Sequence, residues 1–520
     1  IARLGVQHGH EIAPHIPQPN REVTLFVTVG HDFPARYVAC YYTTDGSIPQ
    51  GSRGVAQNGQ VILFQLKDYT WDSVTWGYHA QWIGQIPPQP NNAIVRYRIG
   101  AWSDDNTLPE AFADYPQLKA TTERAAGAFF MGEPVPPLPP IGDFAGKVFT
   151  LHISDAPAPE WAKSAIIYQI FVDRFYAGDG RNWLQTTDLR QPFGGTLWGV
   201  RDKMDYIADL GVNCIWLTPT FVSPSHHGYD ITDYLKTEPR MGGDEALRAV
   251  IESAHRKGIR VLLDLVCNHA SNHNPYFIDA LNNPHSPYRD WFVFDDSPAG
   301  YKTFFGFAGM PYINLQTPAA RDWMCSVGQY WLREFDVDGY RLDHANGPGA
   351  DFWVDFRIAC RQVKSDAFCF GEVVEAPNIL RTYAGGLDGV LDFHIENMLR
   401  MTYAKGEITE AEFDEFVARH YAYFPDGFFL PTFFDNHDMN RFLFTVNGDK
   451  SKLMRAAEAQ FKLPHPPIIY YGTEVGLSQH QSAHEGVGLD ESRLPMLWGD
   501  AQDAELLTFY KGLIVNRRNK

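Results

Sequence analysis

Acidic residues stand at the end of one apolar run after another in this sequence, and this repetition constrains the fold more than any other feature. Asp264, Asp343, Glu372 and Asp435 each close or follow a run with the apolar composition of a buried strand. Segments with helical periodicity lie between these runs. Parallel strands that alternate with helices form a barrel whose chemistry gathers at the carboxyl ends of the strands. We therefore predict an α/β fold built on a (β/α)8 TIM barrel.

The second of these runs ends in an arginine and an aspartate two residues apart, Arg341 and Asp343. Because side chains alternate along a strand, both point to the same side. A neighbouring cation keeps a carboxylate ionised, which suits a nucleophile or a group that stabilises a transition state. The same pattern also occurs as a structural ion pair, so the pair alone leaves both interpretations open.

Four stretches of the sequence carry a specific family resemblance. In this order they resemble the four signature regions of the α-amylase family of glycoside hydrolases: DLVCNH at 264–269, DGYRLDHAN at 338–346, FCFGE at 368–372 and FFDNHD at 433–438. Residues 309–314 and 467–474 resemble further family motifs, and residues 165–175 resemble the first barrel strand of neopullulanase and cyclomaltodextrinase-like members. The resemblance spans about residues 155–520 and implies the same barrel.

The resemblance implies roles for three carboxyl groups. Asp343 matches the nucleophile, Glu372 the general acid/base, and Asp438 the third carboxylate, which holds the sugar hydroxyls. We expect crowding by carboxylates to raise the pKa of Glu372, and Arg341 to keep Asp343 charged. In a retaining pair the two carboxyl groups lie about 5–5.5 Å apart, and we expect that separation between Asp343 and Glu372.

Five further residues match the subsite that holds the reacting sugar ring. The resemblance implies that His269 and His437 hydrogen-bond the sugar and that Tyr229 stacks on it. Asp230 and Arg441 are expected either to pair with each other and shape this subsite or to form structural salt bridges.

A calcium site is implied more weakly. Calcium requires six to eight oxygen ligands. The loop after the first barrel strand resembles the family's calcium loop, but Ala177, Trp183 and Thr196 stand where ligands are usual. The remaining weak metal candidates are Asn268, Asp173, Asp179 and Asn182. We expect this site to be weak or empty, and no cofactor to be required.

The chain is expected to contain three parts. Short β-rich runs separated by turn signals predict an N-terminal β-sandwich over residues 1–131, which binds carbohydrate or narrows the cleft, with Trp71, Trp76, Trp82 and Trp102 as a candidate sugar platform. Residues 132–158 form a proline-rich linker, and residues 159–520 the catalytic barrel, with a small domain B inserted after strand three at about 269–317. The C-terminal β-domain usual in the family is apparently absent, through truncation or as a departure from the family.

The composition excludes several classes of partner. The formal charge is −18 and no basic cluster interrupts it, which argues against nucleic acid and anionic membranes as partners. No window approaches the ~20 apolar residues of a membrane span. Because the sequence begins at Ile1, we leave the compartment unknown: a soluble protein, either cytoplasmic or secreted with its signal removed. The six scattered cysteines are expected to be buried and reduced.

Together these features predict a retaining hydrolase that cleaves α-1,4 bonds, and also α-1,6 bonds, by double displacement. The expected substrates are maltooligosaccharides, cyclodextrins or pullulan, with some transglycosylation, and a homodimer is expected. The alternatives are an endo-α-amylase or glucanotransferase on starch. A non-catalytic glucan-binding scaffold is disfavoured, because all three carboxylates are present. Gly347 replaces the glutamate of the V-A-N-E segment typical of neopullulanase-like enzymes, which leaves the bond preference open.

Overall fold

The computed structural model describes residues 4–72, 77–116, 132, 146–156 and 158–519. The chain divides into two compact units. The first consists of residues 1–156, 349–355 and 375–386, and the second of residues 157–348, 356–374 and 387–520. Each unit is described separately below.

The second unit is built around a parallel sheet. Its strands follow the order β20-β19-β18-β17-β14-β13-β21, and they are β13 (Ile167–Ile170), β14 (Cys214–Leu217), β17 (Arg260–Val266), β18 (Gly339–Asp343), β19 (Phe368–Gly371), β20 (Gly389–Val390) and β21 (Ile468–Tyr470). Parallel bridges from Gly389 to Phe429 and from Thr432 to Pro467 close the ring through residues 429–432. This segment lies between β20 and β21 and brings the number of strand positions in the ring to eight, so the predicted (β/α)8 barrel is confirmed.

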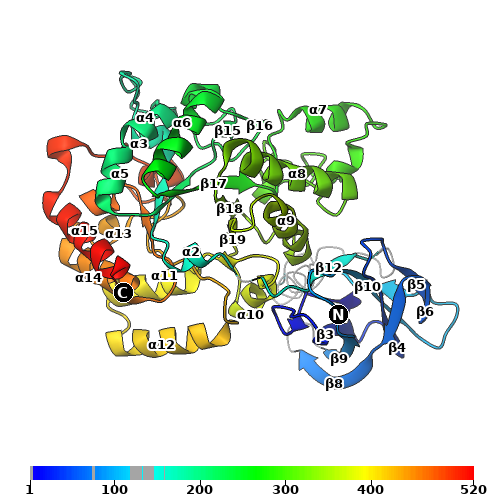
Figure 1. The fold of residues 1–520 in the computed structure, drawn as a ribbon. Coiled ribbons are helices and arrows are strands. Elements are labelled where there is room, and N and C mark those ends of the chain that lie inside the picture. The colour runs from blue at the N-terminus through cyan, green and yellow to red at the C-terminus, as the bar shows by residue number, and fades with distance from the viewer. Residues whose placement is uncertain (1–3, 73–76, 117–131, 133–145, 157, 520) are drawn as a thin grey trace. The chain divides into compact units, whose positions relative to one another are not determined.

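Helices surround these strands (Figure 1). They include α4 (Leu197–Asp202), α5 (Met204–Leu210), α6 (Gly243–Arg256), α8 (Pro318–Phe335), α9 (Ala350–Val363), α11 (Phe393–Leu399), α12 (Glu410–Tyr423), α14 (Lys450–Lys462) and α15 (Ala504–Arg518). Helix α6 shows why they pack inward, since its buried side chains recur at helical spacing and include Leu247, Val250 and Ile251. Side chains cap several helix starts, for example Asp449 on α14 and Asp503 on α15.

An irregular insertion separates β17 from α8, in the place expected for domain B. It contains α7 (Pro275–Asn282) and the short 3-10 helices η2 (Arg289–Trp291) and η3 (Phe304–Gly306). Antiparallel bridges, among them His269 to Tyr312 and Phe294 to Tyr301, hold its loops. Aromatic rings fill its interior. The insertion thus has its own small core, which positions the loop of η3.

The first unit consists mainly of two antiparallel sheets. One contains β1 (Val6–Gln7), β2 (Ile12–Ala13), β3 (Val23–Gly30), β8 (Gln65–Asp72) and β9 (Gly77–Ile86), and the other β4 (Tyr37–Thr43), β7 (Gln60–Leu63), β10 (Ile94–Trp102), β11 (Ala111–Phe112) and β12 (Phe149–His152). Side chains of β3 alternate between buried and half-buried positions. Their buried members join apolar side chains of β4 and β10 in a single core.

Two expectations about the first unit need correction. Phe149–His152 was expected to be linker but forms β12, because its backbone pairs with β10 and its apolar side chains are buried. Residues 133–145 and 157 of the predicted linker lie outside the described residues, as does Trp76. Trp82 and Trp102 are buried and serve the core, whereas Trp71 is 46% exposed. The four tryptophans therefore do not form one sugar platform.

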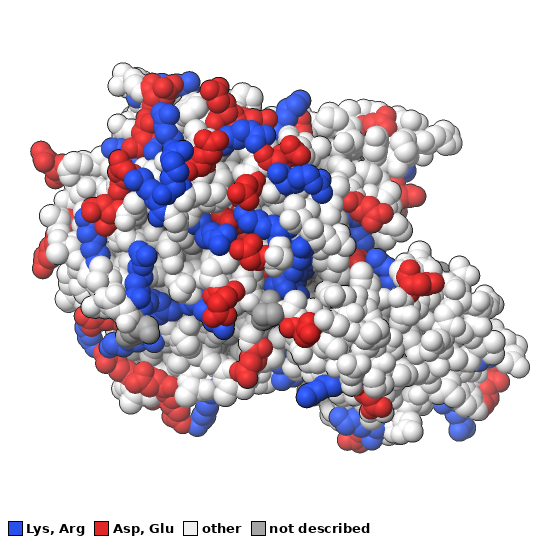
Figure 2. Space-filling view, in the orientation of Figure 1, with Lys and Arg blue, Asp and Glu red and all other residues white. Residues whose placement is uncertain are grey.

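Charged side chains of both signs are interspersed over the face of the molecule in Figure 2 rather than gathered by sign. The six cysteines are free thiols, and five of them are buried. Among the described residues, no helix is long and apolar enough to cross a membrane.

Candidate active site

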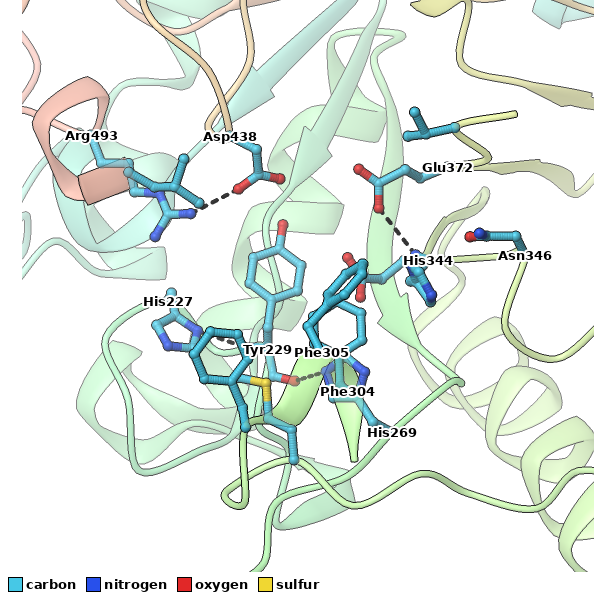
Figure 3. Close-up of a pocket in the computed structure, with 15 residues that line it drawn as sticks. His227, Tyr229, His269, Phe304, Phe305, His344, Asn346, Glu372, Asp438 and Arg493 are labelled. Carbon is cyan, nitrogen blue, oxygen red and sulfur yellow. Dashed lines mark hydrogen bonds and ion pairs between the residues drawn. The ribbon is translucent and has the colours of Figure 1, made fainter. Parts of the chain in front are cut away.

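A cavity of about 860 Å³ lies in the second unit, over the carboxyl ends of the barrel strands. Asp343 is the last residue of β18, Glu372 directly follows β19, and Asp438 lies in the loop that follows the residue 429–432 segment. Figure 3 shows Glu372 and Asp438 facing one space, with Asp438 beside Arg493 and Glu372 beside His344. The cavity is lined by His227, Tyr229, His269, Phe304, Phe305, Phe307, Met310, Asp343, His344, Asn346, Glu372, Val374, Asp438, Leu489 and Arg493.

A single guanidinium group holds the acids at the floor of this cavity. Nη1 of Arg341 donates to Asp264 Oδ1 at 2.7 Å and to Asp343 Oδ1 at 2.8 Å. Nη2 lies 2.9 Å from Glu372 Oε2. Arg341 is fully buried, and its register partner on β17 is Asp264. We call Arg341, Asp264, Asp343 and Glu372 the strand-end cluster. Contact of Asp343 and Glu372 with the two ends of one guanidinium group brings their carboxyl groups close together.

Burial and charge shift the titration of the two acids. Burial raises the pKa of Glu372 to about 7, Arg341 opposes that shift, and the Asp343 carboxylate adds to it. Burial likewise raises the pKa of Asp343 to about 7, against the effect of Arg341. Asp343 Oδ1 accepts a hydrogen bond from the charged Arg341 at 2.8 Å, whereas Glu372 Oε2 accepts one from the neutral backbone N–H of His344 at 3.1 Å. This asymmetry favours an ionised Asp343 and a protonated Glu372.

Asp438 is held by two basic groups. Arg493 Nη2 donates to its Oδ1 at 2.8 Å, and His437 Nε2 lies 3.0 Å from its Oδ2. Burial alone would raise the pKa of Asp438, but His437 and Arg493 outweigh it and lower the pKa below its usual value. Asp438 is therefore ionised at neutral pH, and its side chain is still 35% exposed to the cavity.

The proton on His437 is placed by its neighbours. Burial lowers the pKa of His437 to about 3, so the ring is neutral. Gln169 Nε2 lies 2.7 Å from Nδ1, and donation by this amide leaves the ring proton on Nε2. Nε2 faces both Asp438 and the Tyr229 hydroxyl, which lies 2.6 Å away. The Tyr229 hydroxyl in turn donates to Asp264 Oδ2 at 2.9 Å, which links Asp438 to the strand-end cluster.

His269 is neutral as well, because burial lowers its pKa to about 3. Its Nε2 lies 3.1 Å from the backbone carbonyl of Tyr229, and its ring stacks on Phe304 with 4.4 Å between centroids. Tyr229 stacks on His437 at 5.3 Å. Tyr229 and His269 line the cavity as the resemblance implies, whereas His437 is not among the lining residues and is buried against Tyr229.

Asp230 and Arg441 do not pair, and neither lines the cavity. Asp230 accepts hydrogen bonds from the hydroxyls of Ser223 and Ser225. Arg441 is fully buried, donates to the backbone carbonyls of Ser492 and Tyr471, and stacks on Tyr470. The partners of Asp230 lie in its own loop, whereas those of Arg441 lie 30 and 51 residues further along the chain.

The weak metal candidates do not form a ligand set. The Asp173 carboxylate accepts hydrogen bonds from Phe193 N and Gly194 N and pairs with Arg174. Asp179 lies 3.9 Å from Arg181 at the surface, and Asn182 is exposed. The Asn268 side chain lies against His269. No group of three or more acidic, histidine or cysteine side chains among the described residues could hold a metal ion. The donors present therefore do not fit calcium.

Several residues that line the cavity were not predicted from the sequence. Arg493 follows Asp-Glu-Ser in the loop after β21, where no strand end marks it. Phe305 and Phe307 are 75% and 62% exposed, and Phe305 has a φ of 46°. Phenylalanines in an insertion carry no signal that separates core packing from an exposed position in a cavity. We call residues 304–307 the aromatic loop.

At Gly347, where neopullulanase-like enzymes typically have a glutamate, the backbone lies close to the Asn268 side chain. A Cβ atom at this position would lie 1.7 Å from Asn268 Oδ1, well inside contact distance. That oxygen is buried and has no hydrogen-bond partner among the described residues. Any side chain at position 347 would therefore require Asn268 to move.

Comparison with known proteins agrees with this geometry. Residues 169–518 match the alpha-amylase catalytic domain, and the chain belongs to this family. It is 40% identical over 372 residues to Alpha-amylase 2 of Dictyoglomus thermophilum, covering 71% of this chain and 66% of that protein. Neopullulanase 2 of Thermoactinomyces vulgaris is 34% identical over 386 residues, covering 70% and 64%. A solved structure of a cyclomaltodextrinase aligns with a TM-score of 0.66 at 26% identity, covering 99% of this chain and 85% of that one.

These comparisons confirm the predicted resemblance to neopullulanase and cyclomaltodextrinase-like members of the family. The matched region covers slightly less than two thirds of the length of the two sequence relatives.

Proposed function

We propose that the protein hydrolyses α-1,4-glucosidic bonds, and also α-1,6 bonds, with retention of configuration at the anomeric carbon. The observation that carries this proposal is the pair of carboxyl groups, Asp343 and Glu372, held by one buried guanidinium group in a cavity that also contains Asp438. Two close carboxyl groups with different protonation are what double displacement requires.

The two chemical steps divide between these acids. In the first, protonated Glu372 gives its proton to the glycosidic oxygen as the bond to the anomeric carbon breaks. The ionised Asp343 then forms a bond to that carbon. In the second, the Glu372 carboxylate takes a proton from water, and the water oxygen displaces Asp343. Arg341 opposes the rise that burial causes in the pKa of Asp343 and so favours its anionic form before attack, and burial favours return of the proton to Glu372.

The remaining cavity residues position the sugar. Asp438 is anionic and accepts hydrogen bonds from ring hydroxyls, while Arg493 and His437 hold its carboxylate in place. Tyr229 offers an aromatic face without adding charge. The neutral His269 ring lines the cavity, and the neutral His437 ring acts from behind it by holding Asp438 and Tyr229.

Short or cyclic glucans are the proposed substrates, with pullulan as a further one and transglycosylation as a side reaction. The aromatic loop supports this, because exposed rings beside the acids can stack on sugar rings. An endo-α-amylase acting on starch is the second candidate, favoured by the 40% identity with Alpha-amylase 2 of Dictyoglomus thermophilum.

For the first unit we propose a role in narrowing access to the cavity of a partner chain within a homodimer. The edge strand β8 supports this, because it exposes Tyr69 and Trp71, and Trp71 contacts the exposed Tyr78 of β9. Light scattering of the full chain measures the dimer. A monomer that prefers starch to cyclodextrin would instead favour a polymer-binding role.

Product analysis tests the activity directly. The chain is incubated with maltotriose, cyclodextrin, pullulan and starch, and the products and their anomeric configuration are followed by NMR. The proposal expects retained α-products and faster turnover of the small substrates. Products of inverted configuration would contradict double displacement, and starch as the fastest substrate would favour the endo-α-amylase.

A further inference from the structure

A second cavity of about 750 Å³ lies in the second unit and plays no part in the mechanism above. Residues 186–189 and 193 of the loop before α4 form one side of it, and residues 477–497 of the segment after β21 form the other. Its lining mixes apolar side chains, such as Phe193 and Leu494, with hydroxyl, amide and carboxylate groups.

Glu491 is the unusual group in this cavity. Its side chain lines the cavity although the residue is only 5% exposed. Among the described residues it has no hydrogen-bond or ion-pair partner, and its oxygens are not among the fully enclosed unpaired atoms. Its carboxylate therefore reaches the cavity with its acceptor capacity unused by the protein, and it is open to a ligand that donates hydrogen bonds to it.

The amide of Gln479, which also lines the cavity, is already engaged. It donates to Asn440 Oδ1 and to Gln481 O, and it accepts from Arg441 N. None of these contacts involves Glu491, so the Glu491 carboxylate remains an open acceptor in the lining of the cavity.

One short segment separates this cavity from the active site. Leu489 and Arg493 line the active-site cavity, whereas Val487, Glu491 and Leu494 line the second one. Arg493 also holds Asp438 at 2.8 Å. A ligand bound to Glu491 would therefore contact the opposite side of the segment that positions the third carboxylate.

We propose that the second cavity binds a short α-glucan, with sugar hydroxyls donating to Glu491 and the apolar faces of the rings packing on Phe193 and Leu494. A pyranose ring presents both kinds of surface, and the cavity offers both. A metal ion fits less well, because no group of three or more ligating side chains occurs among the described residues. This inference rests on the proposed function, since it takes its ligand from the same substrate class.

Calorimetric titration with maltotetraose tests the inference. The full chain carries Glu372→Gln, so that the ligand is not consumed. Two sites per chain are expected. Adding Glu491→Gln should weaken one site by roughly tenfold or more, as for a lost hydrogen bond to a charged group, and leave the other unchanged. Glu485→Gln is the matched control, since Glu485 is an exposed acid of the same segment outside both cavities, and it should keep both sites.

A second variant guards against indirect effects of the lost charge. Leu494→Trp fills the cavity without touching Glu491 and should abolish the same site. A single site before and after these changes, or two sites that survive Glu491→Gln, would overturn the inference. If one site binds and the chain with Glu372 restored hydrolyses maltotetraose, the proposed function stands and only the second site is rejected. No binding at all, with no turnover, would reject both.

Discussion

The strand-end cluster and the aromatic loop line the same cavity but differ in how they are held. Arg341, Asp343 and Glu372 are fixed at the ends of buried strands by hydrogen bonds and charge. Phe305 and Phe307 stand exposed on a loop of the inserted domain, and Phe305 adopts a left-handed backbone conformation. Under the proposed function, this contrast assigns the chemistry to a hydrogen-bonded polar framework and substrate choice to an exposed surface.

The largest expected effect follows removal of the nucleophile. Asp343→Asn should lower kcat on maltotriose by on the order of 10⁴-fold or more, because no carboxylate remains to attack the anomeric carbon. The melting temperature should hold or rise, since a buried charge is removed. Assays of turnover and thermal unfolding check this. Retention of more than a tenth of the activity would show that the strand-end cluster is not the catalytic framework.

Replacing the proposed general acid, Glu372, should reduce the rate of hydrolysis by an amount that depends on the leaving group of the substrate. Glu372→Gln should slow hydrolysis of maltotriose by roughly 10²–10⁴-fold. Hydrolysis of α-maltosyl fluoride should change much less, because fluoride leaves without a proton. Comparing kcat for both substrates separates these effects. Equal losses on both substrates would assign the acid role to another group.

The pH dependence should report the same residue. Burial raises the pKa of Glu372 to about 7, and the first step needs its proton. As the pH rises above about 7, kcat/KM should therefore fall, approaching tenfold per pH unit. Steady-state rates between pH 5 and 9 measure this. The alkaline limb should vanish for fluoride hydrolysis by Glu372→Gln, and its persistence there would place the titration elsewhere.

A smaller effect, on folding free energy, is expected from a substitution at Gly347, which lies against Asn268. Gly347→Ala places a Cβ against Asn268 Oδ1 and should cost about 1–3 kcal/mol of folding free energy. Urea unfolding measures the cost. Asn268→Gly in the same chain should recover most of it, because the clashing oxygen is gone. A Gly347→Ala chain as stable as the parent would show that Asn268 moves freely.

Substitutions in the aromatic loop should change stability and KM less than any of the changes above. Phe305→Gly relieves a left-handed backbone conformation and should stabilise the fold by about 1 kcal/mol. It should also raise KM for maltooligosaccharides by roughly fivefold through lost stacking. Phe307→Ala is the matched control, with an exposed ring and a φ of −77°, and it should raise KM without added stability. An unchanged KM in both variants would remove the aromatic loop from the binding surface.

Much of the framework was predictable because it follows from local sequence. Apolar runs that end in acids identified the strands and placed Asp343 and Glu372 at their carboxyl ends, while the resemblance to the α-amylase family singled out Asp438. Arg493 was not predictable, because its contact with Asp438 joins two loops 55 residues apart. The pairing considered for Asp230 and Arg441 does not occur, since Asp230 accepts from Ser223 in its own loop and Arg441 donates to Ser492, 51 residues further along the chain.

The sequence by itself determined the barrel, the order of its strands and the three carboxyl groups, because periodicity and strand ends are local properties of the chain. Only the tertiary structure decided which acid accepts the aligned hydrogen bond of Arg341, which nitrogen of His437 carries the proton, and how Gly347 meets Asn268. These depend on distances of a few ångströms between segments far apart in the chain. Burial, the main cause of the raised pKa of Glu372, likewise arises only when the strands and loops are assembled.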